Sequence, residues 1–81
     1  MNSDFEYVIG IDLGIHTQDK ETAAICKKFS DGSIQILDIC HNIDSLSLKV
    51  YYPLTVIATE EDIEALRVRG IIKENTRVKI C

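Results

Sequence analysis

Hydrophobic and polar residues alternate along the first half of the chain. Between Phe5 and Leu13 every second residue is apolar, which predicts a β-strand with one strongly apolar face. The segments 22–29 and 34–40 are rich in apolar and β-branched residues and predict two further strands. Gly14 to Lys20 is polar and predicts a loop.

The second and third predicted strands are joined by the sequence Ser-Asp-Gly-Ser at 30–33. Because Asp-Gly tolerates positive φ at both central positions, it favours a two-residue type I′ hairpin. In that register Ile25 faces Asp38 and Cys26 faces Leu37. Both faces of this hairpin carry apolar residues, so we expect it to be covered on both sides, at least in part.

A fourth strand is predicted at 46–50, where Leu46, Leu48 and Val50 alternate with polar residues. Pro53 should end this strand or confine it to an edge, because proline cannot donate to the ladder. The segment 54–58 then predicts a short fifth strand or an extended entry into a helix.

A single helix is predicted after Thr59, which can cap a backbone N–H group while three acidic residues follow at the positive end of the dipole. Ile63 and Leu66 share the inner face, and Gly70 suits the left-handed position after the last turn. A last strand follows at 76–80. The pattern predicts one α+β domain over 1–81, with a small, mostly antiparallel sheet in the order β-β-β-β-(β)-α-β and one helix.

Composition limits the classes of function. The chain has 81 residues, 46% of them hydrophobic, so it can build one marginal core for which a partner or a homo-oligomer is a reasonable expectation. A net charge of −4 argues against nucleic acid binding by this chain alone. No apolar run approaches the roughly 20 residues that cross a membrane. The polar start and three widely spaced cysteines predict a reducing, cytoplasmic setting.

Asp12 is the clearest candidate for chemistry, since it ends the first strand between Gly10 and Gly14. A carboxylate between glycines lets a metal ion or a phosphate approach the backbone closely. His16 and Asp19 in the following loop would complete a site of mixed oxygen and nitrogen ligands for Mg²⁺ or Mn²⁺. The alternative is that Asp12 hydrogen-bonds the turn and that His16 is an exposed loop residue.

The first 40 residues resemble the start of a ribonuclease H-like domain. The resemblance rests on Val-Ile-Gly-Ile-Asp-Leu-Gly at 8–14, Asp19, Thr-Ala-Ala-Ile at 22–25, Asp-Gly-Ser-Ile at 31–34 and Leu-Asp at 37–38. It is nearest to the nuclease domain of phage large terminase subunits, and implies that Asp12 binds catalytic Mg²⁺ or Mn²⁺. The first strand is also similar to the first phosphate loop of sugar kinases and actin-type ATPases.

The remaining sequence departs from both families. A two-metal nuclease needs several carboxylates that converge from separate elements. After Asp38 the chain offers Asp44 in a loop and four acidic residues between 60 and 64, where they suit a helix start. The nucleotide-binding families need a second lobe, for which 81 residues are too few. The resemblance therefore implies a truncated or repurposed piece of such a fold.

Two further groups predict contacts with a partner. Tyr51 and Tyr52 form an aromatic patch of the kind enriched at interface centres; alternatively, they form a core edge with one ring in and one out. Arg67 and Arg69, with Lys73, form a basic cluster that suits either the negative end of the helix dipole or a contact with phosphate or acidic protein.

These observations favour a non-catalytic protein. We expect a small accessory or inhibitory factor of phage or mobile-element type that masks a surface of a larger protein and needs no cofactor. The alternative is a fragment of a metal-dependent ribonuclease H-like nuclease or phosphotransfer domain that uses Asp12. The missing second and third carboxylates separate the two hypotheses and favour the first.

Overall fold

The fold is a single sheet with one α-helix. The computed structural model describes residues 4–17 and 20–81. In chain order the elements are β1 (Phe5–Asp12), β2 (Thr22–Phe29), β3 (Ile34–Cys40), the short 3₁₀ helices η1 (Ile43–Ser45) and η2 (Leu48–Val50), β4 (Leu54–Ala58), α1 (Glu60–Val68) and β5 (Arg77–Ile80).

The five strands form one mixed sheet in the order β3-β2-β1-β4-β5, with β1 at its centre. The pairs β1–β2 and β2–β3 are antiparallel over eight and six positions, whereas β1–β4 and β4–β5 are parallel over four positions each. The predicted class, an α+β domain with a mostly antiparallel sheet and one helix, is confirmed.

The hairpin between β2 and β3 has a three-residue loop, so the predicted two-residue type I′ turn is wrong. Phe29 N–H donates to Ser33 O, and Gly32 N–H donates to Phe29 O, both at 2.9 Å. Gly32 ends the loop at φ +92°, which is the left-handed residue of a three-residue hairpin. Asp31 Oδ1 accepts bonds from the N–H and hydroxyl groups of Ser33, and these bonds lower the pKa of Asp31.

A β-bulge in β3 reconciles this turn with the register further along the strand. Ile25 faces Asp38 as predicted, but Cys26 faces Ile36 because the register shifts between Ile25 and Cys26. Leu37 is the extra residue. Without the bulge, the register set by the three-residue loop would place the side chains beyond Ile36 on the opposite face of the sheet. The extra residue in the bulge restores their observed facing.

The predicted strand at 46–50 is wrong, because η1 and η2 occupy that region. Leu46 N–H donates to Ile43 O and Tyr51 N–H donates to Leu48 O, which are bonds over three residues. The side chain of Ile43 is buried in the core, and those of Leu46, Leu48 and Tyr51 are half-buried against it, whereas Val50 is exposed. The apolar spacing therefore serves a turning segment that lies across the sheet.

Helix α1 begins and ends where the sequence predicts. Thr59 Oγ1 accepts the N–H of Asp62 at 3.2 Å. At the other end Gly70 has φ +77°, its N–H donates to Arg67 O, and Ile71 N–H donates to Leu66 O. These two bonds form a Schellman motif, which satisfies carbonyl groups that the helix end leaves unpaired.

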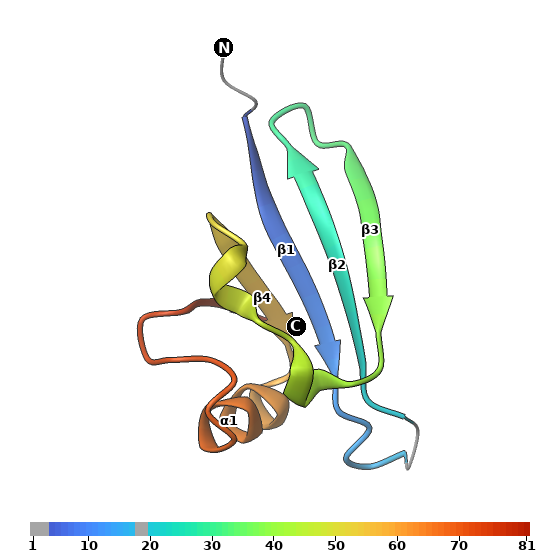
Figure 1. The fold of residues 1–81 in the computed structure, drawn as a ribbon, viewed down its shortest axis with the longest axis vertical. Coiled ribbons are helices and arrows are strands. Elements are labelled where there is room, and N and C mark those ends of the chain that lie inside the picture. The colour runs from blue at the N-terminus through green and yellow to red at the C-terminus, as the bar shows by residue number, and fades with distance from the viewer. Residues whose placement is uncertain (1–3, 18–19) are drawn as a thin grey trace.

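Helix α1 and the η1–η2 segment pack on the same face of the sheet (Figure 1). That face holds the core, whose fully buried large side chains are Ile9, Ile43, Val56 and Leu66. Because paired residues share a face of the sheet, the register assigns a second apolar set to the opposite side, which we call the open face: Val8, Ala24, Cys26, Ile34, Ile36, Ile39 and Ile57. Within residues 4–17 and 20–81, no helix is long and apolar enough to span a membrane.

Candidate functional site

Asp12 lies at the carboxyl end of the central strand, where it closes a tight turn. Its Oδ1 accepts the N–H of Gly14 at 2.8 Å, and Gly14 has φ +63°. A carboxylate that binds the N–H two residues ahead is an Asx turn. One oxygen of Asp12 therefore has a structural role, which agrees with the alternative prediction that Asp12 hydrogen-bonds the turn.

Asp62 comes to the same end of the sheet from the first turn of α1, which follows β4. Only 6% of its surface is exposed, and its Oδ2 accepts the N–H of Leu13 at 3.4 Å. Asp12 and Asp62 thus bind the N–H groups of nearby residues, at the carboxyl ends of two neighbouring parallel strands. From the sequence, Asp62 is expected only at the helix start, and the cap at Thr59 is the signal that fixes its position in the first turn.

His16 pairs with Glu61. Its Nε2 lies 2.9 Å from both carboxylate oxygens of Glu61, and this hydrogen bond and the negative charge raise the pKa of His16. Asp19, the third predicted metal ligand, lies outside the described residues. In the part of the chain that the structure describes, no group of three or more His, Cys, Asp and Glu side chains is placed to hold a metal ion. The Asp12–His16–Asp19 site stays a prediction.

Arg69 connects three separate segments. Its guanidinium donates to the Glu21 carboxylate at 2.6 and 3.2 Å and to Asp44 Oδ1 at 2.7 Å. These contacts raise the pKa of Arg69 above its ordinary value. Arg69 therefore ties the end of α1 to the start of β2 and to η1, whereas Arg67 is exposed in the last turn of the helix.

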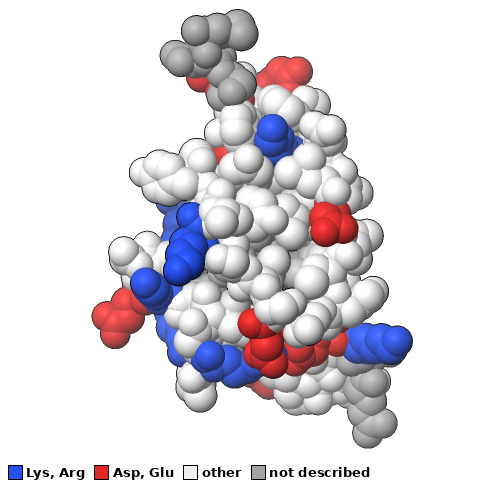
Figure 2. All heavy atoms as spheres, in the orientation of Figure 1, with Lys and Arg blue, Asp and Glu red and all other residues white. Residues whose placement is uncertain are grey.

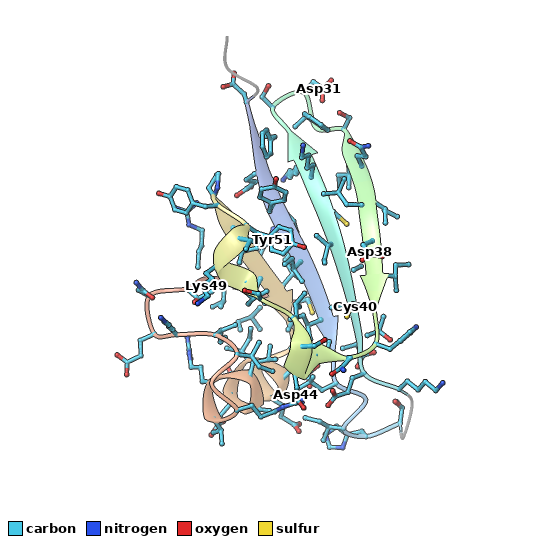
Figure 3. All side chains as sticks on the ribbon, viewed as in Figure 1. Asp31, Asp38, Cys40, Asp44, Lys49 and Tyr51 are labelled. Carbon is cyan, nitrogen blue, oxygen red and sulfur yellow. The ribbon has the colours of Figure 1, made fainter. Side chains whose placement is uncertain are left out.

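The two tyrosines take different positions. The ring of Tyr51 packs edge-on against Tyr7, with centroids 5.1 Å apart, and is half-buried (Figure 3). Tyr52 is 86% exposed. This is the one-in, one-out arrangement of a core edge, and it leaves a single aromatic ring, that of Tyr52, on the surface.

Strand β3 exposes a row of large apolar side chains that the sequence analysis missed. Ile34, Ile36 and Ile39 lie on the open face and are between 55% and 65% exposed. For this strand the expectation of cover on both sides is wrong, because one nine-residue helix and the η1–η2 segment cover only one face. The signal was available: apolar residues on both faces, with only one helix to cover them.

The two edges of the sheet differ in character. The outer strand β5 has four residues, and Arg77 and Lys79 point to the open face. Short length and cationic side chains are the usual protection of an edge strand. The opposite edge strand, β3, has seven residues and Asp38 as its only charge, and Figure 2 shows that side of the molecule largely uncharged.

The chain has no significant match among protein-family models, curated proteins or solved structures. The most distinctive features of the described surface are the exposed isoleucines of β3 and the open face on which they lie.

Proposed function

We propose that this chain is a small, non-catalytic protein-binding factor of the accessory or inhibitory kind, which masks a surface of a larger protein. The observation that carries the proposal is the exposed apolar row of Ile34, Ile36 and Ile39 on an edge strand. Contiguous exposed apolar surface on a small domain typically marks an interaction site.

The backbone of β3 supports the same conclusion. Phe29 and Ser33 form a hydrogen-bonded pair next to the turn. Since such pairs alternate in an antiparallel ladder, the N–H and C=O groups of Ile34 point away from β2. A strand of the partner can bind these groups by β-augmentation, while the isoleucine side chains supply apolar contact.

The energy available is adequate for a specific contact. Full burial of one isoleucine contributes about 1.5–3 kcal/mol. Because the three isoleucines are somewhat more than half exposed, their burial would contribute on the order of 3–5 kcal/mol before the cost of association.

A cytoplasmic setting is part of the proposal and is supported by the three free cysteines. A phage or mobile-element origin is also part of it, and rests on the resemblance of the first strand to that of terminase nuclease domains.

Ile36→Glu tests this placement. We expect the immobilised wild-type chain to retain a protein from a lysate of its host and the Ile36→Glu variant to retain at least tenfold less, because burial of an unpaired carboxylate opposes the contact. The matched control is Val68→Glu, the same change at an 83% exposed position on α1. With amide spectra showing all three proteins folded, equal capture by all three would contradict the proposal.

A second candidate function rests on the proximity of Asp12 and Asp62. In open sheets with parallel strands, ligands bind beyond the carboxyl ends of those strands, and both carboxylates lie there. A divalent cation held by them would support the ribonuclease H-like alternative, with further carboxylates supplied by a second copy or by further sequence.

Mn²⁺ titration of the isotopically labelled chain tests the second candidate. It predicts selective broadening of the amides of residues 12–14 and 61–62 at sub-millimolar Mn²⁺, and loss of that broadening in Asp12→Asn. The exposed Asp31 turn is the internal control for weak, unspecific binding. Broadening that is equal at both places, or unchanged in Asp12→Asn, would exclude the second candidate.

A further inference from the structure

A hollow lies between the η2–β4 segment and the loop from α1 to β5. It measures about 830 Å³, and its lining includes Leu48, Tyr52, Ile71 and Thr76. This volume is in the range of sites for small molecules, roughly 300–1,000 Å³. It is formed by elements on the opposite side of β1 from β3, so it is separate from the surface of the proposed protein contact.

The charge of the hollow is opposite to that of the chain. Its lining contains four basic residues, Lys49, Arg69, Lys73 and Arg77, and one acidic residue, Asp44, in a chain with a net charge of −4. The contacts with Asp44 and Glu21 neutralise Arg69. The other three cations have no ion pair within the described residues. Figure 2 shows basic side chains gathered on this side of the molecule.

Lys49 and Lys73 both line the hollow, and within the described residues neither forms an ion pair with a carboxylate. A bound anion would compensate their two charges. Lysine and arginine are the side chains that bind phosphate groups, lysine as a point charge and arginine as a planar fork. Lys49 comes from the η2 segment and Lys73 from the loop between α1 and β5, so two separate segments supply the cations of the hollow.

Tyr52 adds an apolar recognition element. Tyr52 lines the same hollow and is 86% exposed. An exposed aromatic face beside cations is a platform on which the ring of a base can stack, at a gain of about 1–3 kcal/mol per base in comparable sites. We propose that this hollow binds a phosphorylated small molecule, with Lys49 and Lys73 on the phosphate and Tyr52 on an aromatic ring of the ligand.

The experiment is a set of amide-shift titrations of the labelled full chain with inorganic phosphate, ribose 5-phosphate, AMP and adenosine. The proposal predicts shifts confined to residues 47–54 and 69–77 with the three phosphates, none with adenosine at equal concentration, and tightest binding for AMP. Tyr52→Ala should bring AMP to the affinity of ribose 5-phosphate. Equal affinity of phosphate and AMP in the wild type would overturn the role of Tyr52.

The charge part is tested by Lys49→Gln/Lys73→Gln, which should weaken AMP binding about tenfold, since hydrogen bonds to charged groups are the strong ones. Lys28→Gln, an exposed position on β2, is the control and should change nothing. These exposed lysines support no packing, so the variants remain folded. Absence of shifts at 10 mM ligand, equal weakening by Lys28→Gln, or stronger binding of a glutamate-rich peptide than of AMP would overturn the proposal.

Discussion

Leu66→Ala is expected to destabilise the domain by about 2–5 kcal/mol, which is the usual cost of removing a fully buried leucine side chain. Leu66 has no exposed surface and joins the helix to the sheet through the core of Ile9, Ile43 and Val56. A domain of this size has a total free energy of unfolding of roughly 4–12 kcal/mol. The change therefore removes a large share of the stability.

Urea denaturation monitored by circular dichroism measures this effect. The control is Val68→Ala, two residues further along the same helix and 83% exposed, which should change the free energy of unfolding by no more than about 0.5 kcal/mol. Equal midpoints for the two variants would show that α1 does not pack on the sheet as described.

Asp62→Ala is expected to cost about 1–3 kcal/mol, because it leaves the buried N–H of Leu13 without its acceptor. The carboxylate also lies in the first turn of α1, where the interaction of a negative charge with the helix dipole stabilises the helix by about 0.3–1 kcal/mol. The loss should be largest where β1 enters its turn, since Asp62 holds the backbone there.

Amide hydrogen exchange localises this effect. In Asp62→Ala the amide of Leu13 should exchange faster relative to amides of the β2–β3 hairpin, whereas Asp62→Asn, which keeps an oxygen acceptor, should be affected clearly less. If Asn and Ala are equally destabilising, the charge rather than the hydrogen bond stabilises this end of the sheet. If neither differs from the wild type, the bond to Leu13 has no energetic role.

Local signals predicted the parts of the fold that local chemistry decides. The cap at Thr59 and the glycine at position 70 fixed α1, because capping depends on only a few neighbouring residues. Strands β2 and β3 have the predicted bounds, since their ends coincide with polar turns. These features do not depend on which surface of the sheet becomes the core.

Features that depend on tertiary packing escaped prediction. The alternation of apolar and polar residues at 46–50 is as compatible with a turning segment over the core as with a strand. The burial of Ile43 in the core, which the sequence pattern does not show, distinguishes the two. The bulge at Leu37 reconciles the register set by the three-residue loop with the face that the side chains at the end of β3 occupy. Neither the loop sequence nor the strand sequence predicts it alone. The placement of β3 at an edge follows from strand order, which periodicity does not contain.

The sequence predicted the positions of some candidate site residues but not which of them lie close together. The position of Asp12 at a strand end followed from its sequence, but its nearness to Asp62 required the parallel pairing of β1 with β4. The partner contact was expected at the tyrosines or at the basic cluster of Arg67, Arg69 and Lys73. The exposed apolar row of Ile34, Ile36 and Ile39 lies instead on β3.

Site-specific photo-crosslinking from position 36 tests the proposed protein contact most directly. A photoreactive phenylalanine analogue replaces Ile36 in one variant and Val68 in the other, and both variants are irradiated in cells that produce them. A partner contact at β3 predicts one dominant covalent adduct with a single larger protein from position 36, and no such adduct from position 68. Absence of an adduct from position 36, or the same adduct from both positions, would contradict it.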